Sequence, residues 1–247
     1  MTRKRLARTQ ENAVRGKECP PAIPAGTFVV VPAYNEATCI ERVLRELVRV
    51  CPDVVVVDDG SRDGTYAAAR RAAPYVLQHA LNRGQGAALQ TGIEFALRRG
   101  ARYVVTFDAD GQHCIENIAA LLAPISSGKY DITLGSRFLG EAVRIPPLRK
   151  AVLRLAVLFT RLVSRIPVTD THNGLRAFSR RAAEQISITN DRMAHASEII
   201  DIIRQLNLPY CEVPVRVEYT EYSLKKVRSL RGAVRILFDY FVTRAAT

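Results

Sequence analysis

Short runs of β-branched and aromatic residues alternate along this chain with longer segments whose apolar residues recur at helical spacing. The runs predict strands at 27–32, 54–57, 76–78, 103–107, 132–138, 177–178 and 211–217. The longer segments predict helices at 36–50, 87–99, 115–122, 150–165, 198–206 and 230–241, and one that starts near residue 65. Strands that alternate with helices in this way are typical of an α/β fold with a mainly parallel sheet flanked by helices.

The chain divides by composition into a tail, one domain and a terminal helix. Residues 1–26 are rich first in Lys and Arg and then in Pro and Gly, which predicts a flexible basic tail. A chain of 247 residues is long enough to bury one large core, so we expect residues 27–225 to fold as a single domain. Residues 226–247 are expected to form an amphipathic C-terminal helix.

The apolar run at 104–107 ends in two carboxylates, at Asp108 and Asp110. Open α/β sheets bind their ligands at the carboxyl ends of the strands, where both acids can point into a crevice. Two carboxylates without a surrounding cage suit Mg²⁺ or Mn²⁺, which keep some waters and take further ligands from a diphosphate. An isolated triplet of this kind fits a simple polar turn equally well, so the metal site depends on the rest of the chain.

Positive charge is in clear excess, with 36 Lys and Arg residues against 24 Asp and Glu residues and a net charge of +12. Such an excess favours anionic partners, among them nucleic acid, phosphorylated substrates and acidic membrane surfaces. The sequence contains no nucleic-acid-binding motif, and its basic residues are not interleaved with aromatic ones. We therefore expect no nucleic-acid partner.

Cysteine usage and hydropathy indicate a cytoplasmic protein. The five cysteines are scattered and form no CxxC pair, which is typical of free thiols in a reducing compartment. No apolar run reaches the roughly 18–20 residues that a transmembrane helix needs. The basic opening has no apolar stretch behind it, so it does not resemble a signal peptide.

Seven motifs lie within or next to the predicted strands and loops along the chain. They are Pro32-Ala33-Tyr34-Asn35-Glu36, Asp58-Asp59-Gly60-Ser61, Gly84-Gln85-Gly86-Ala87-Ala88, Asp108-Ala109-Asp110-Gly111-Gln112-His113, Gly135-Ser136-Arg137-Phe138, the segment 170–176 and Glu212-Val213-Pro214. Together they resemble family 2 of the glycosyltransferases, in particular the dolichyl- and polyprenyl-phosphate sugar synthases. The resemblance implies the GT-A fold, a Rossmann-like mixed sheet, and makes residues 27–225 the catalytic domain.

The resemblance implies a donor site for a GDP- or UDP-linked sugar. The residues expected to bind the donor are Pro32, Tyr34, Glu36, Val57, Asp59, Gly84, Asp108 and Ala109. The implied metal ligands are Asp108, Asp110 and Gln112, which would hold Mg²⁺ or Mn²⁺ on the donor diphosphate. His113 would either assist that phosphate or cap the following helix.

The resemblance also implies an arginine that faces the phosphate of the acceptor, and Arg137 matches it. Arg149 or Lys150 would supply a second cation and Lys226 a third. Two positions depart from the family pattern: Arg154 stands where a serine is expected, which puts the identity of the acceptor in doubt, and Gln85 stands where a lysine is common.

The acceptor decides whether the reaction needs a base. A phosphate monoester is already an oxyanion near neutral pH, so it needs cations to position it and no base. A sugar hydroxyl must lose a proton as it attacks, and Asp170 is the candidate base for that case. The cations favour an inverting transfer to a polyprenyl phosphate, with Asp110 and Arg137 as catalytic residues. Two alternatives stay open: transfer to a hydroxyl of a soluble glycan or small molecule, and a non-catalytic nucleotide-sugar or nucleic-acid binding module.

The predicted helix at 150–165 carries basic residues beside a broad apolar face, and 230–241 repeats the pattern. Helices of this kind lie in the headgroup region of a membrane, which predicts a peripheral protein at the cytoplasmic membrane face. The same apolar faces also fit packing into the core or against a second copy of the chain. A separate membrane protein or a homo-oligomer is therefore also an expected partner.

Overall fold

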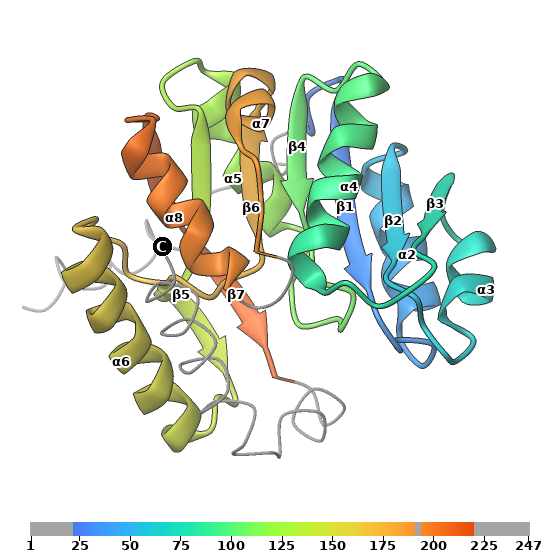
Figure 1. The fold of residues 1–247 in the computed structure, drawn as a ribbon, viewed down its shortest axis with the longest axis horizontal. Coiled ribbons are helices and arrows are strands. Elements are labelled where there is room, and N and C mark those ends of the chain that lie inside the picture. The colour runs from blue at the N-terminus through green and yellow to red at the C-terminus, as the bar shows by residue number, and fades with distance from the viewer. Residues whose placement is uncertain (1–21, 191–193, 220–247) are drawn as a thin grey trace, which may run out of the picture.

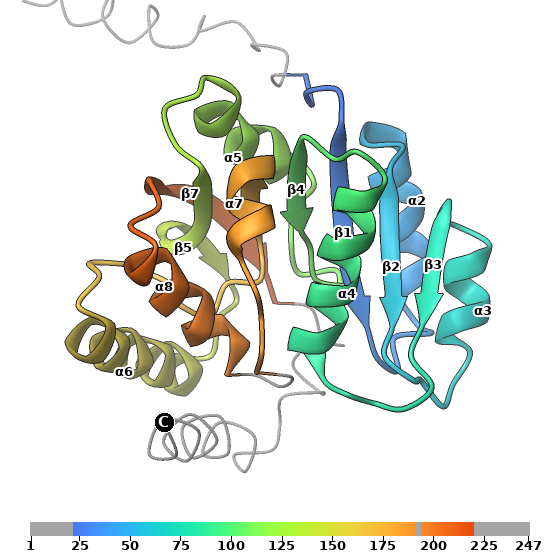
Figure 2. The ribbon, with the colours of Figure 1, turned by 45° about the horizontal axis from the view of Figure 1, so that its top comes forward.

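The computed structural model of the chain describes residues 22–190 and 194–219. A seven-stranded sheet forms its centre, with helices on both faces (Figures 1 and 2). The strands are β1 (Thr27–Ala33), β2 (Val54–Asp58), β3 (Tyr75–Gln78), β4 (Tyr103–Thr106), β5 (Ile132–Val143), β6 (Arg176–Ser179) and β7 (Tyr210–Glu218). Their order across the sheet is β3-β2-β1-β4-β6-β5-β7. Only β6 runs antiparallel to its neighbours, which confirms the expected mixed and mainly parallel sheet.

Two apolar clusters, one on each face of the sheet, form the core. The described helices are α2 (Ile40–Val50), α3 (Thr65–Arg70), α4 (Gln85–Arg98), α5 (Asn117–Ser126), α6 (Pro147–Ser164), α7 (Arg180–Gln185) and α8 (His195–Gln205). Helices α2, α3 and α5 pack on one face, and α4, α7 and α8 on the other. Alternate residues of a strand point to opposite faces, so Val29 joins one cluster and Val30 the other. Burial on both faces explains why the strands read as continuous apolar runs.

Every strand and helix expected within the described residues is present, with small shifts at the ends. The largest shifts are in β5, which continues to Val143, and in α2, which begins at Ile40 because the preceding polar residues form a turn. In that turn Asn35 has φ 55°, and its side-chain oxygen accepts a hydrogen bond from the amide of Arg62 at 2.9 Å. Helix α7 was not expected, since Ala182 and Ala183 are its only apolar residues and they show no helical spacing. The Ser179 hydroxyl caps it by accepting from the Ala182 amide at 3.2 Å.

Several sequence expectations fall outside the described residues. These are the first 21 residues of the tail, the helix at 230–241 and Lys226. Among the helices that the structure describes, none is both long and apolar enough to cross a bilayer.

The topology brings the motif-bearing loops to one edge of the sheet. Strands β1, β2, β4 and β5 all end there, since β5 and β4 are each antiparallel to β6. Strand β6 starts at the same edge, because Arg176 pairs with Thr106 at the end of β4. The loops after four strands and before a fifth therefore surround one site.

Candidate active site

A cavity of about 600 Å³ lies at this edge of the sheet. Most of the residues expected from the sequence line it, although they come from loops far apart in the chain. The expected lining residues are Pro32, Tyr34, Glu36, Asp59, Gly84, Asp108, Ala109, Asp110, Gln112, Arg137 and Arg149. Further lining residues, for which the sequence predicted no individual role, include Asn82, His172, Asn173, Gly174 and His195.

The carboxylates that follow β4 are each held by hydrogen bonds from neighbouring side chains or backbone. Asp108 accepts a hydrogen bond from Nε2 of Gln85 at 3.0 Å and contacts Nε2 of His113 at 3.0 Å. Asp110 accepts from both the backbone amide of Gln112 at 3.1 Å and its side-chain Nε2 at 2.5 Å. His113 therefore supports a carboxylate. The residue immediately before α5 makes no capping hydrogen bond with its side chain.

The two carboxylates have opposite pKa shifts. Burial, followed by the negative charge of Asp108, raises the pKa of Asp110 to about 6. Burial alone would raise the pKa of Asp108 too, but the hydrogen bond and the charge of His113 bring it below its ordinary value. Two acids in this relation repel each other, and a cation between them would relieve the repulsion.

This donor set fits a divalent metal ion that shares its coordination with a ligand. Within residues 22–190 and 194–219, no three His, Cys, Asp or Glu side chains are grouped so as to hold a metal by themselves. Mg²⁺ is commonly bound through one or two protein carboxylates, with waters and substrate phosphates completing its shell. Asp108 and Asp110 match that chemistry. Gln112 lies beside them, but its amide nitrogen faces Asp110.

The expected nucleotide side of the cavity is built on the loop after β2. Both carboxylate oxygens of Asp59 accept from the next loop: Oδ2 from the amide of Gly84 at 2.6 Å and Oδ1 from that of Arg83 at 3.0 Å. His79 contacts Oδ1 of the same carboxylate through Nδ1, at 2.7 Å. Gly84 has φ 109°, a backbone conformation that side-chain-bearing residues rarely adopt, so a glycine is needed where this loop turns into α4.

Three expected site residues do not line the cavity. Val57 is fully buried in the core cluster under α4, because its position in β2 points away from the edge. Lys150 is exposed at the start of α6, and the neighbouring Arg149 is the one that reaches the cavity. Asp170 is buried behind Arg137, with a side chain only 1% exposed.

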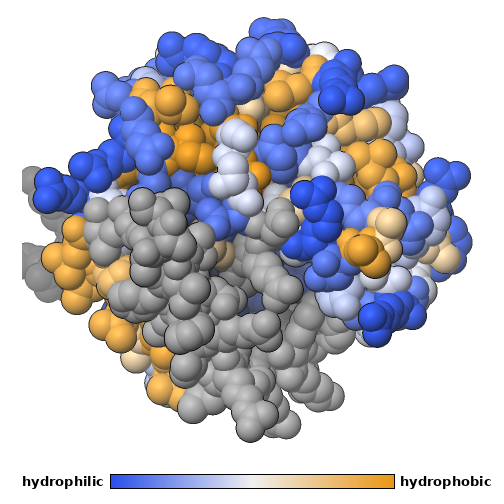
Figure 3. Space-filling view, in the orientation of Figure 1, coloured by the Kyte–Doolittle hydropathy of each residue, from blue (hydrophilic) through white to orange (hydrophobic). Residues whose placement is uncertain are grey.

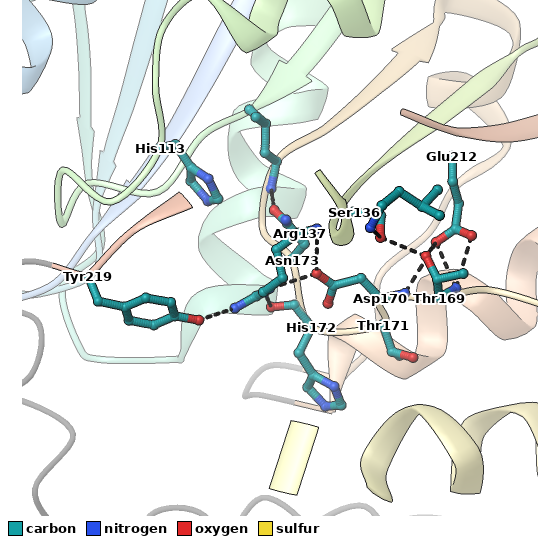
Figure 4. A network of polar contacts seen from close by, with 12 residues as sticks. His113, Ser136, Arg137, Thr169, Asp170, Thr171, His172, Asn173, Glu212 and Tyr219 are labelled. Atoms are coloured by element: carbon teal, nitrogen blue, oxygen red, sulfur yellow. Dashed lines mark hydrogen bonds and ion pairs between the residues drawn. The ribbon is translucent and has the colours of Figure 1, made fainter. Parts of the chain in front are cut away.

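Arg137 is held in a buried network of hydrogen bonds, drawn in Figure 4. Its Nε donates to Oδ2 of Asp170 at 2.6 Å, its Nη1 to the hydroxyl of Tyr219 at 2.7 Å and its Nη2 to the carbonyl of His172 at 2.8 Å. The charge of Asp170 keeps the pKa of Arg137 above its ordinary value despite burial. Three of the five guanidinium N–H groups are used in this way, which fixes the plane of the cation at the cavity wall.

The loop that carries Asp170 is fixed in turn by the Glu-Val-Pro motif of β7. One oxygen of Glu212 accepts from the amide of Thr169 at 2.8 Å, from its hydroxyl at 2.8 Å and from the amide of Asp170 at 3.2 Å. The Thr169 hydroxyl also contacts that of Ser136, on β5, at 2.6 Å. Figure 4 shows this chain of contacts running from Glu212 toward Arg137. The motif therefore acts as a support for the loop.

Arg149 is a second cation at the same wall, and one of its nitrogens has no hydrogen-bond partner within the described residues. Its guanidinium lies 4.7 Å from the ring centroid of Tyr219, the residue whose hydroxyl binds Arg137. Its Nη1 is buried and makes no hydrogen bond within the described part of the chain. Burial lowers the pKa of Arg149, with Arg137 adding to the shift. A buried cationic donor without an acceptor is costly unless an anion binds it.

The motif segment 170–176 supplies further residues at the cavity. Burial lowers the pKa of His172 to about 4, so its imidazole is neutral at physiological pH. Gly174 lies against Asp108, and a Cβ at this position would overlap both carboxylate oxygens. Arg176 donates to the carbonyl oxygen of Thr171 at 2.9 Å, and burial lowers its pKa to about 10.

Comparison with known proteins agrees with this geometry. The family model described as Glycosyl transferase family 2 matches residues 28–187. A UDP-N-acetylglucosamine--dolichyl-phosphate N-acetylglucosaminyltransferase from Methanococcus voltae is 33% identical over 85% of this chain and 93% of its own length. A polyprenol monophosphomannose synthase from Mycolicibacterium smegmatis is 34% identical over 80% of this chain and 78% of its own.

A solved structure supports the fold independently. The glucosyl-3-phosphoglycerate synthase of Mycobacterium tuberculosis, in complex with Mn²⁺, UDP-glucose and phosphoglyceric acid, superposes with a TM-score of 0.67. The match covers 89% of this chain and 78% of the synthase, at 18% identity. These findings confirm the resemblance drawn from the motifs and the GT-A type of the sheet.

Proposed function

Because this chain belongs to glycosyl transferase family 2 and is a glycosyltransferase, we propose that it moves a sugar from a nucleoside diphosphate to a polyprenyl phosphate, with inversion at the anomeric carbon. Two relatives that align along most of the chain carry dolichyl phosphate or polyprenol in their names. Their likeness supports a lipid acceptor, and the cavity supports a phosphate on that lipid.

The observation that carries the proposal is Nη1 of Arg149, which has no hydrogen-bond partner among the described residues and lies beside the fixed guanidinium of Arg137. A phosphate monoester is an anion near neutral pH and needs cations to seat it. Asp170, the candidate base for a hydroxyl acceptor, is buried and its Oδ2 is bound to Arg137 at 2.6 Å. A carboxylate in that position stabilises the arginine, so the site suits an acceptor that has no proton to lose.

The transfer needs one bond to form and one to break. An acceptor phosphate oxygen attacks the anomeric carbon, and the bond from that carbon to the donor diphosphate breaks with its electrons left on the departing nucleoside diphosphate. Attack from the side opposite the leaving group inverts the anomeric configuration. No proton is removed, because the attacking oxygen is already ionised.

The departing nucleoside diphosphate would be stabilised on the side of the cavity that faces the two arginines. Asp108 and Asp110 would hold Mg²⁺ or Mn²⁺, which supplies positive charge to the diphosphate of a GDP- or UDP-sugar. Gln85 and His113 keep the Asp108 carboxylate in place, and Gln112 does the same for Asp110. On the nucleotide side, Tyr34 offers a partly exposed ring for stacking.

Helix α6 is the part of the chain that we expect to meet the membrane. Leu148, Leu155, Leu158 and Leu162 are between 54% and 70% exposed on it, far more than leucines in a core. Figure 3 shows an apolar surface along this helix. Arg154 and Arg161 are also exposed there, and such a mixture suits anionic headgroups above acyl chains. The enzyme would then be peripheral, and a second membrane protein or a second copy are further candidate partners.

A kinetic comparison of Arg149→Gln with Arg98→Gln tests the acceptor site. Arg98 is exposed at the far end of α4, so it serves as a matched loss of charge outside the cavity. We expect Arg149→Gln to raise the KM for polyprenyl phosphate at least tenfold while the KM for the nucleotide-sugar changes less than twofold. An unchanged acceptor KM, or sugar transfer that persists in excess EDTA, would remove the basis of the proposal.

A further inference from the structure

The loop between Asp170 and Arg176 connects the two charged sides of the cavity. The carbonyl of His172 accepts a hydrogen bond from Nη2 of Arg137 at 2.8 Å. Two residues later, Gly174 lies so close to Asp108 that it has no room for a side chain. Asn173 is the residue between them, and it lines the cavity.

Among the residues that the structure describes, only one end of the Asn173 side chain has a hydrogen-bond partner. Its Oδ1 accepts a hydrogen bond from the amide of Leu175 at 3.0 Å. This bond closes an Asx turn, in which an Asn side chain binds the backbone amide two residues later. Because that amide needs an acceptor, the bond also fixes which end is nitrogen. Asn173 is only 2% exposed, and its Nδ2 has no hydrogen-bond partner among the residues that the structure describes.

A buried amide donor without an acceptor destabilises a protein unless a ligand supplies the acceptor. In the proposed reaction, a neutral group lies between the two charged sides of the cavity. The donor diphosphate is at Asp108 and the acceptor phosphate is at Arg137, so the transferred sugar must lie between them. A neutral amide that donates is suited to the oxygen atoms of a sugar, which carries no charge there.

We propose that Asn173 is a specificity-determining residue that donates a hydrogen bond from Nδ2 to an oxygen of the transferred sugar. This inference rests on the proposed function and goes beyond it, since it assigns the recognition of the sugar to a residue that binds neither phosphate. Asn173 thereby contributes to the affinity for the nucleotide-sugar but not to that for the nucleoside diphosphate alone.

Asn173→Ser separates the two ends of the side chain. A serine hydroxyl can accept from the same backbone amide two residues on, so the turn is kept while the amide donor is lost. Asn207→Ser is the matched control, because Asn207 is exposed and outside the cavity. Isothermal titration in Mg²⁺ or Mn²⁺ gives the Kd for UDP and UDP-glucose, UDP and UDP-N-acetylglucosamine, and GDP and GDP-mannose. The quantity of interest is the nucleotide Kd divided by the nucleotide-sugar Kd, since any change at the diphosphate cancels in that ratio.

For the sugar that the wild type binds best, we expect the ratio to fall about tenfold in Asn173→Ser and to stay within twofold in Asn207→Ser. A ratio within twofold of the wild type in Asn173→Ser would overturn the inference, even if both Kd values had risen together. Should Asn173→Ser fail to fold, Asn173→Thr keeps the turn acceptor on a larger side chain and is judged by the same ratio. If the wild type binds none of these nucleotides, the proposed function itself fails, which is a different result.

Discussion

Replacing Asp170 with asparagine should destabilise the protein through Arg137. In the native structure the two side chains form an ion pair at 2.6 Å, and they are only 5% and 1% exposed. The asparagine has nearly the same volume but no charge, so the guanidinium would be left buried without its counterion. Arg137→Met produces the reverse defect, because, of the described donors, Asp170 would then keep only the backbone amide of residue 137, at 3.0 Å.

The structure sets the expected size of both effects. Removing one partner of a buried ion pair costs about 3 to 5 kcal/mol, most of it from the charge that remains. The double variant Asp170→Asn/Arg137→Met leaves no charge behind. Its cost should therefore be close to that of one single variant, so the coupling energy equals one single cost, about 3 to 5 kcal/mol. The cost of each single variant is no larger than the unfolding free energy of a typical domain, about 5–15 kcal/mol, so the variants are expected to fold.

Urea unfolding followed by far-UV circular dichroism measures all four proteins of this cycle. The free energies of unfolding are comparable only if the m-value is the same in each. Costs that add to within about 0.5 kcal/mol would refute the reasoning. Asp170 would then not be the counterion of Arg137, and its role as a base for a hydroxyl acceptor would return.

Two further predictions concern the loop at 171–174. The pKa of His172 is lowered to about 4, so its contribution to stability is complete above the unfolded value of roughly 6.5 and is lost as the pH falls toward 4. Between pH 7 and pH 5 the wild type should lose about 2 kcal/mol more unfolding free energy than His172→Gln, measured in urea; equal losses would show that the imidazole is not buried as described. Gly174→Ala would place a methyl group on the Asp108 carboxylate, so we expect donor binding in Mn²⁺ to weaken at least tenfold, with about 1–3 kcal/mol lost in stability. Calorimetry with UDP-glucose and GDP-mannose checks this, and wild-type affinity in the alanine variant would contradict the close approach.

The donor-side residues that could be predicted from the sequence follow a strand directly, whereas Arg137 and Arg149 were expected from the family resemblance and also line the cavity. Tyr34, Asp59 and Asp108 each come within a few residues of a buried apolar run, and parallel strands bring such ends to one edge. Local pattern and topology therefore agree for the donor half of the cavity.

The acceptor half depends on contacts between distant parts of the chain, which no local pattern encodes. Glu212 binds the amides of residues 42 and 43 positions away, and Tyr219 binds Arg137 across 82 positions. Arg149 and Lys150 are neighbours on α6, so the exact rotation of that helix decides which of them reaches the cavity. Val57 was expected at the donor site but does not reach it, because alternation along β2 turns its side chain into the core.

The most direct test offers the enzyme a phosphate and a hydroxyl on the same lipid. Vesicles would contain polyprenyl phosphate and polyprenol in equal amounts, together with Mg²⁺ or Mn²⁺ and a radiolabelled nucleotide-sugar chosen from the binding series. If ionised phosphate attacks at Arg137 and Arg149, label should enter only the lipid phosphate, with inverted anomeric configuration, and EDTA should stop it. Label on polyprenol, or labelled lipid phosphate formed at the same rate in EDTA, would show that the cavity works in another way.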